Sequence, residues 1–202
     1  MDRKIAFLFW ACLVAALVTG NILPSQAEDY VVGSVPVSVT MGDLDGDTDL
    51  DLAVANYGSG DASILLGIGD GTFQNAVNYG VGGALSSVAI GDLDGDSDLD
   101  LAVANLTSGN VSVLLGNGDG TFQAPVNYGA GDRPVSIAIG DLDGDNDLDL
   151  AVVIAGSNSV SVLLGYPFSE GWDWGWVRDE GAERVPQRRK QCGKGYMRRG
   201  GS

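Results

Sequence analysis

Three short acidic segments contain the residues of this chain best suited to chemistry. Each places five aspartates at every second position and then turns apolar: GDLDGDTDLDLAVAN at residues 42–56, GDLDGDSDLDLAVAN at 91–105 and GDLDGDNDLDLAVVI at 140–154. Carboxylates this close together repel one another unless a cation neutralises them. The segments therefore predict cation binding.

The oxygen-only chemistry of these segments favours calcium. Ca²⁺ takes about 6–8 oxygen ligands in irregular geometry, whereas Mg²⁺ demands stricter octahedral coordination and is the second choice. Zn²⁺ would want His or Cys ligands, and the chain has no His. We expect the first three aspartate side chains of each segment to converge on one ion, the fourth residue to offer its backbone carbonyl and the fifth to close the site. The candidate metal ligands are Asp43, Asp45, Asp47, Asp49, Asp51, Asp92, Asp94, Asp96, Asp98, Asp100, Asp141, Asp143, Asp145, Asp147 and Asp149.

The segments do not fit the EF-hand, the best-known calcium loop. An EF-hand needs Gly at the sixth position and Glu at the twelfth. Counting from Asp43, Gly46 is fourth, Thr48 is sixth and Val54 is twelfth. One such loop could simply keep a surface soluble, but three at a fixed spacing indicate metal binding.

The acidic segments belong to a longer internal repeat. Asp43, Asp92 and Asp141 are spaced by 49 residues, and residues 42–79 and 91–128 are identical at 29 of 38 positions. Agreement of this extent indicates that one structural unit has been copied.

Each unit is expected to form four short strands. In the first unit, residues 38–41 alternate polar and apolar, which predicts a half-buried strand. Residues 52–55 and 63–66 are continuous apolar runs and predict buried strands. The Asp-Gly turn at 69–72 then leads to a weaker fourth strand within residues 73–79. No window shows the spacing of an amphipathic helix.

Four strands in about 50 residues is typical of a propeller blade, with a stacked solenoid as the alternative. The predicted fold class is all-β: an incomplete β-propeller-like array of about three four-stranded blades, at about residues 30–78, 79–127 and 128–165. The repeat stops after Gly165, so we expect the third blade to lack its outer strand. Because propellers close with about 4–8 blades, three would pair with other chains, stay open or be a piece of a longer gene.

Both ends of the chain differ from the repeats. Residues 1–27 are expected to be a secretory signal peptide cleaved after Ala27, because basic residues precede a short apolar run and small residues precede the cleavage point. An uncleaved anchor is the alternative, although the run is shorter than the ~20 residues a span needs. Residues 166–202 combine Trp with Gly, Arg and Lys. They could stack on sugars or dock on acidic partners, but we expect a disordered tail.

The charge distribution restricts the partners. The whole chain carries a net charge of −16, and residues 28–165 hold 21 acidic residues and a single basic one, Arg133. Such a body repels phosphate backbones and attracts cations, so nucleic acid is not an expected partner. Without the predicted signal peptide only Cys192 remains, so no internal disulfide can hold the loops.

The repeats also resemble a known family. The stretches VTMGDLDGDTDLDLAVAN, VAIGDLDGDSDLDLAVAN and LLGNGDGTFQAPVNYG resemble FG-GAP/VCBS repeats, the blade type also found in integrin α-subunit propellers, and the resemblance extends from Tyr30 to Gly165. It implies calcium held between the first two strands of each blade in a structural role. It also implies an extracellular setting and a part in adhesion or ligand recognition.

These observations lead to one expected function and two alternatives. We expect a secreted, calcium-binding, non-catalytic module that recognises an extracellular protein or polysaccharide, with self-association as a way to complete the propeller. An enzyme is not expected, because acid–base catalysis needs carboxylates in unlike environments, whereas these lie in near-identical loops. The alternatives are an accessory fragment of an extracellular polysaccharide-active enzyme and a truncated gene product without a function of its own.

Overall fold

The computed structural model describes residues 28–165 and 177–178. The predicted signal peptide lies outside these residues, as does the predicted tail except for Val177–Arg178. The described residues form strands, turns and irregular segments and contain no helix, so none of them forms a helix that could cross a membrane.

The strands form three antiparallel sheets of four strands, and in each the strands neighbour one another in chain order. The first sheet contains β1 (Pro36–Gly42), β2 (Asp51–Asn56), β3 (Asp61–Leu65) and β4 (Val77–Gly80). The second contains β5 (Leu85–Gly91), β6 (Asp100–Asn105), β7 (Asn110–Leu114) and β8 (Val126–Gly129). The third contains β9 (Pro134–Gly140), β10 (Asp149–Ile154), β11 (Ser159–Leu164) and β12 (Val177–Arg178). The predicted all-β class is confirmed.

The strand register repeats with the sequence. Val39 lies opposite Val54 in the first sheet, and Val88 lies opposite Val103 in the second. In the third sheet Ile137 occupies the place of Val88, opposite Val152. The 49-residue period is therefore a structural period as well.

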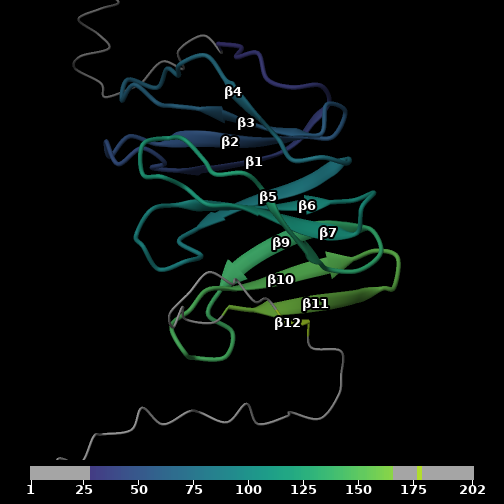
Figure 1. Ribbon diagram of the computed structural model, residues 1–202. Helices are drawn as coiled ribbons and strands as arrows, with labels where there is room; N and C mark the ends of the chain where they lie inside the picture. Colours follow the sequence, from purple (N-terminus) through teal and green to yellow (C-terminus); the bar gives the residue numbers. More distant parts are fainter. Residues whose placement is uncertain (1–27, 166–176, 179–202) are drawn as a thin grey trace, which may run out of the picture.

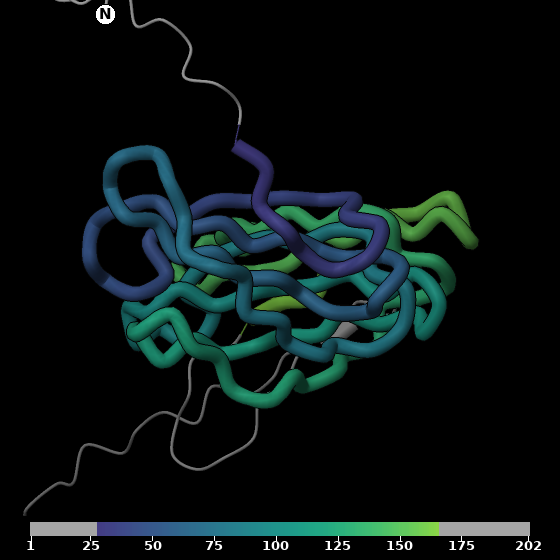
Figure 2. The backbone as a smooth tube through the Cα atoms, turned by 90° about the horizontal axis from the view of Figure 1, so that it is seen from above, coloured from purple at the N-terminus to yellow at the C-terminus, as the bar shows by residue number. Residues whose placement is uncertain are grey.

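The sheets lie one on another, with the second between the other two (Figure 1). Viewed along the stack they overlap, so their broad faces meet (Figure 2). Their contacts concentrate on the first strands, β1 against β5 and β5 against β9. Sheets that meet mainly through their first strands are consistent with an incomplete propeller-like arrangement.

Two apolar cores lie between the sheets, and both reuse the same repeat positions. In the first core Ala53 and Ile64 of the first sheet face Leu101 and Val103 of the second. In the second core the opposite face of the second sheet meets the third. Its buried members are Leu93, Ala102, Ala104, Val111, Val113, Ala130, Ile137, Leu150, Val152, Ile154 and Leu163. Among the described residues, only the second sheet packs against another sheet on both faces.

The prediction that the first strand is half-buried through its apolar residues is wrong for the first unit. The alternation is present in β1, but the side chains of Val39 and Met41 are exposed while Ser38 and Thr40 are partly buried. The reason is that β1 belongs to an end sheet, whose apolar side has no neighbouring sheet among the described residues. Val88, which takes the place of Val39 in the second unit, is buried against the first sheet.

The expectation that the third sheet lacks an outer strand is also wrong in part. The short strand β12 pairs with Leu163 and Leu164 on the outer side of β11. Residues 159–162 have no outer strand partner in the described part of the chain. The outer position of this sheet is therefore filled at one end only.

A buried polar network, which sequence reasoning missed, supports the hairpin between the second and third strands. In the first sheet Asn56 Nδ2 donates to Asp61 Oδ1 and to Ser63 Oγ, both at 2.8 Å. The Ser63 hydroxyl in turn donates to Asn78 Oδ1 at 2.7 Å, which joins β2, β3 and β4. The second sheet repeats this network around Asn105. These bonds tie the outer strand to the buried part of its sheet.

Candidate metal centre

Each acidic segment forms the loop between the first two strands of a sheet. We call these the first, second and third acidic loops, at residues 43–51, 92–100 and 141–149. The chain turns sharply within each loop: in the first, Gly46 and Thr48 both have φ 77°. Left-handed backbone is unfavourable for Thr, yet Ser97 and Asn146 repeat it at the same place. The loop conformation is therefore imposed by its side chains.

Aspartate carboxylates impose this conformation by accepting backbone amides. Asp43 accepts from Gly46 N at 2.8 Å and from Thr48 N at 3.0 Å. Asp45 accepts from Asp47 N at 3.2 Å, and the second and third loops repeat these bonds. Short side chains that bond the backbone two or three residues ahead are typical of such turns. Aspartates at every second position therefore set the backbone conformation of the loop as well as supplying carboxylates.

The fifth aspartate of each loop has a separate role. Asp51 is fully buried and accepts from Leu44 N at 2.6 Å and from Gly67 N at 2.7 Å. Gly67 follows β3, so one carboxylate joins the acidic loop to the start of the next turn. A Cβ at Gly67 would lie 2.6 Å from Leu50 O, so only glycine allows this approach. Asp100 and Asp149 make the same two bonds.

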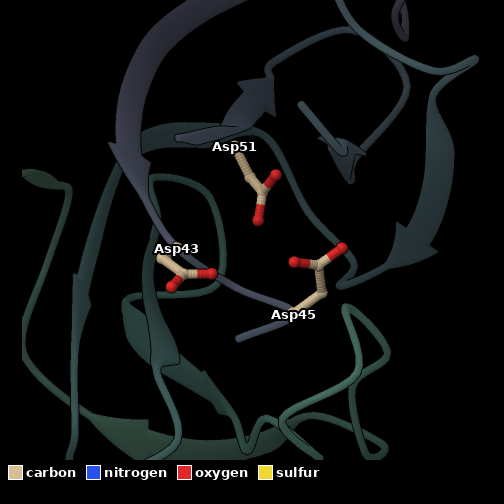
Figure 3. Close-up of side chains that lie close together, drawn as sticks. All are labelled: Asp43, Asp45 and Asp51. Atoms are coloured by element: carbon tan, nitrogen blue, oxygen red, sulfur yellow. The ribbon is translucent and has the colours of Figure 1, made fainter. Parts of the chain in front are cut away.

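Carboxylates converge in all three loops. In the first loop Asp43, Asp45 and Asp51 each bring one oxygen within 4.8 Å of the others, and their carboxylates point toward a common space (Figure 3). In the other loops the groups that meet this distance are Asp92, Asp94 and Asp96, and Asp141, Asp143 and Asp149. The first two predicted ligands of every loop therefore come together, while the remaining member differs between loops.

In the first two loops the fourth aspartate lies apart from the converging group, whereas in the third loop Asp147 lies near the charges of the other four aspartates. The carboxylate of Asp49 lies beside the turn after β3, where a Cβ at Gly69 would come within 2.4 Å of Asp49 Oδ2. Asp98 has the same position beside Gly118. In the third loop Asp147 Oδ2 is buried without a hydrogen-bond partner. An unpartnered buried carboxylate oxygen is costly, and it fits a loop that takes a cation.

The pKa shifts show how unfavourable these clusters are when ionised. Burial, with a hydrogen bond to Asp96 as the next cause, raises the pKa of Asp94 to about 6. Burial also raises the pKa of Asp100 to about 7, although two backbone amides oppose this shift. The pKa values of Asp45 and Asp143 rise through burial and the charges of neighbouring aspartates. A divalent cation would favour the ionised form of each group, so the donor set fits such an ion.

Two other aspartates have a turn role instead. Asp70 Oδ1 accepts from the backbone amide of Thr72 at 3.0 Å and from its hydroxyl at 2.6 Å, which lowers the pKa of Asp70. Asp119 and Thr121 repeat the arrangement in the second unit. These carboxylates fix the turn between the third and fourth strands and are not part of the converging groups.

The first acidic loop also contacts the next unit. Gly120 N, in the turn after β7, donates to Leu44 O at 2.9 Å. A Cβ at Gly120 would lie 3.4 Å from Asp45 Cβ and 2.8 Å from Leu66 Cδ2. The position of this loop is thus coupled to the junction between the first and second sheets.

The fold and the loops together define a class: an all-β repeat protein whose sheets each carry an acidic loop between their first two strands. A model of the FG-GAP-like repeat family matches the chain twice, over residues 43–103 and 92–152. These matches cover more than half of the chain, and the chain belongs to the FG-GAP-like repeat family. A search of curated proteins returned no match.

Substituting Asp100 by Ala should strongly destabilise the protein. The change leaves the buried amides of Leu93 and Gly116 unpaired, and each unpaired group costs about 1–3 kcal/mol. We expect the free energy of unfolding, measured in urea with EDTA present, to fall by about 2–5 kcal/mol. Asp96→Ala in the same loop is the control, because Asp96 is exposed and its loss relieves repulsion. Equal effects of the two changes would contradict the role assigned to Asp100.

Proposed function

We propose that this chain is an exported, calcium-binding repeat module that recognises a protein or polysaccharide outside the cell and catalyses no reaction. The observation that carries the proposal is the convergence of carboxylates at the same place in three successive loops. Membership of the FG-GAP-like repeat family supports it, because these repeats are often extracellular.

Calcium suits the donor set better than other common ions. The converging atoms are carboxylate oxygens, the hard ligands that Ca²⁺ prefers, and the described residues offer no imidazole or thiolate beside them. In the first loop Asp43, Asp45, Asp47 and Asp51 would hold the ion, with the backbone carbonyl of Asp49. The corresponding residues of the other loops would do the same.

The ion would supply positive charge where the chain concentrates negative charge. The residues of the loop would then keep their present hydrogen bonds, and the ion would offset the burial and the neighbouring charges that raise the pKa values of Asp45 and Asp94. Because Leu44 bonds to Gly120, a firmer first loop also supports the junction with the second sheet. The proposed role of calcium is therefore structural.

The carboxylates support binding better than catalysis. Asp100 has the raised pKa expected of a general acid, but it is buried and both its oxygens already accept backbone amides. A group so placed cannot reach a substrate. The other aspartates recur in equivalent positions, whereas acid–base pairs need unlike environments.

Calcium should stabilise the protein. At ~10 mM Ca²⁺ and site affinities of ~10⁻⁴–10⁻³ M, each site contributes about 1–3 kcal/mol to the free energy of unfolding. We expect the melting temperature to rise by several degrees relative to EDTA. Calorimetric titration should show about three ions per chain, and Asp45→Ala, Asp94→Ala and Asp143→Ala should each remove about one.

The control for these titrations is Asp70→Ala, which also removes one acidic residue but lies in a turn outside the converging groups. It should leave the number of bound ions unchanged. An unchanged melting temperature with calcium, or an equal loss of ions in the control, would refute the proposed sites.

Export should remove residues 1–27. The proposal predicts that the protein recovered from outside an expressing cell begins at Glu28, as determined by N-terminal sequencing. A chain that keeps its first residues and stays with the membrane fraction would instead support an anchor.

Ligand recognition should depend on the ion, because the acidic loops hold the ends of the sheets. Binding of the purified protein to arrays of extracellular glycans and proteins should be seen with calcium and lost in EDTA. The Asp45→Ala variant should bind more weakly than Asp70→Ala. Binding that persists in EDTA would show that ligand recognition does not depend on an ion in the acidic loops.

A further inference from the structure

The two end faces of the stack are both apolar and exposed. Val39 and Met41 lie on the outward face of the first sheet, and the side chain of Val39 is 62% exposed. Val153 and Val160 lie on the outward face of the third sheet, and the side chain of Val160 is 60% exposed. The second sheet separates these faces, so they lie at opposite ends of the molecule (Figure 1).

These end faces are copies of two faces that already meet inside the chain. Val39 corresponds by the period to Val88, which is 5% exposed because it packs against the first sheet. Val160 corresponds to Ala62, which is fully buried in the same core. The outward face of the first sheet is therefore equivalent to the face that the second sheet packs against the first sheet. The outward face of the third sheet is equivalent to the face of the first sheet on which the second sheet packs.

The fit between the two surfaces includes a leucine that packs on a glycine. A Cβ at Gly42 would lie 3.0 Å from Leu99 Cδ1 of the following unit, and a Cβ at Gly91 would lie 3.1 Å from Leu148 Cδ1. The third such glycine, Gly140, has no described residue within 4 Å of that position. The leucine that corresponds to Leu99 and Leu148 in the first unit is Leu50, which is exposed. The first unit thus has an unpacked leucine, Leu50, and the third sheet has an uncovered glycine, Gly140, on which such a leucine would pack.

A hydrogen bond between neighbouring first strands repeats in the same way. Val88 N donates to Ser38 Oγ, and Ile137 N donates to Ser87 Oγ, both at 3.3 Å. The next acceptor in the series is Ser136, which is exposed on the third sheet. The corresponding donor at the other end is the amide of Val39.

The first described residues also occupy the place of a missing outer strand. Tyr79 of β4 makes an edge-to-face contact with Phe122 of the next unit, with ring centroids 5.4 Å apart. Tyr30 makes the same contact with Phe73, also at 5.4 Å. Residues 28–31 therefore lie against the first unit as the outer strand of a preceding sheet would. Residues 159–162, the part of β11 without an outer partner among the described residues, are the complementary edge.

From these matches we infer that two copies of this chain associate head to tail, with the first sheet of each packed on the third sheet of the other. Residues 28–31 of each copy add to the partner's β11, with Tyr30 opposite Val160 as Tyr79 is opposite Ala62. The resulting six sheets fall within the 4–8 blades at which propellers close. The pairing rests on apolar faces and strand edges, so it is separate from the calcium proposal.

The first experiment measures mass. Sedimentation equilibrium of the full chain, with calcium present, should give two copies at micromolar concentration. Val39→Glu should yield one copy that keeps the circular dichroism of the parent, because the charge would be buried at the new interface. Val126→Glu is the matched control: Val126 is exposed on the outer strand of the central sheet and should leave the dimer intact. A monomeric parent chain, or a dimer that survives Val39→Glu, would overturn the inference.

The second experiment tests the exchanged strand and does not depend on a destabilising change. In the proposed register Val31 lies opposite Ser159, as Gly80 lies opposite Asp61, and both side chains are exposed. Val31→Cys with Ser159→Cys, in a Cys12→Ser and Cys192→Ser background, should give a disulfide-linked dimer under mild oxidation. The control, Val31→Cys with Ser108→Cys, should stay a single chain. Absence of the linked dimer would overturn the strand exchange, and linked species of three or more copies would overturn the closed dimer.

Discussion

Each sheet depends on one carboxylate buried where its second strand begins. The two oxygens of Asp51 hold the amides of Leu44 and Gly67, so the acidic loop and the turn after β3 are fastened at one point. A buried carboxylate is tolerable only with such hydrogen bonds. Burial raises the pKa of Asp100, and the charges of Asp94 and Asp96 add to this shift. The stability of each unit is therefore a balance between amide hydrogen bonds, which favour the ionised carboxylates, and burial and mutual repulsion, which oppose them. A bound cation would shift this balance toward the folded state.

The two hydrogen bonds of this buried aspartate explain why the acidic loop and the sheet recur together in each unit. Glycine at positions 67, 116 and 165 lets the chain approach the loop closely enough for its amide to reach the buried aspartate. Gly120 extends the linkage to the following sheet through Leu44. Loop chemistry, sheet register and the junction between sheets are thus joined by a short set of backbone contacts. For this reason a change in the charge of a loop should alter the stability of the sheet that carries it.

The sequence allowed the period, the strands and the acidic loops to be predicted because their signals are local. Apolar runs such as residues 52–55 and turns such as Asp70-Gly71 act within a few residues. The exposure of Val39 could not be predicted, since it depends on which faces of a sheet have neighbours. The double hydrogen bond of Asp100 was also missed, because its donors, Leu93 and Gly116, are brought to it by the fold. Val177–Arg178 carries no repeat signal, so its pairing with β11 could not be foreseen.

The recurrence of Ser38–Val88 as Ser87–Ile137 has a consequence for how such a chain can change in evolution. Both partners of every junction are encoded at a constant distance along the gene. Unequal recombination between near-identical stretches would add or delete one full period, and the new junction would reproduce an old one. Ancestral and descendant chains would then differ by whole sheets that are joined through the same contacts.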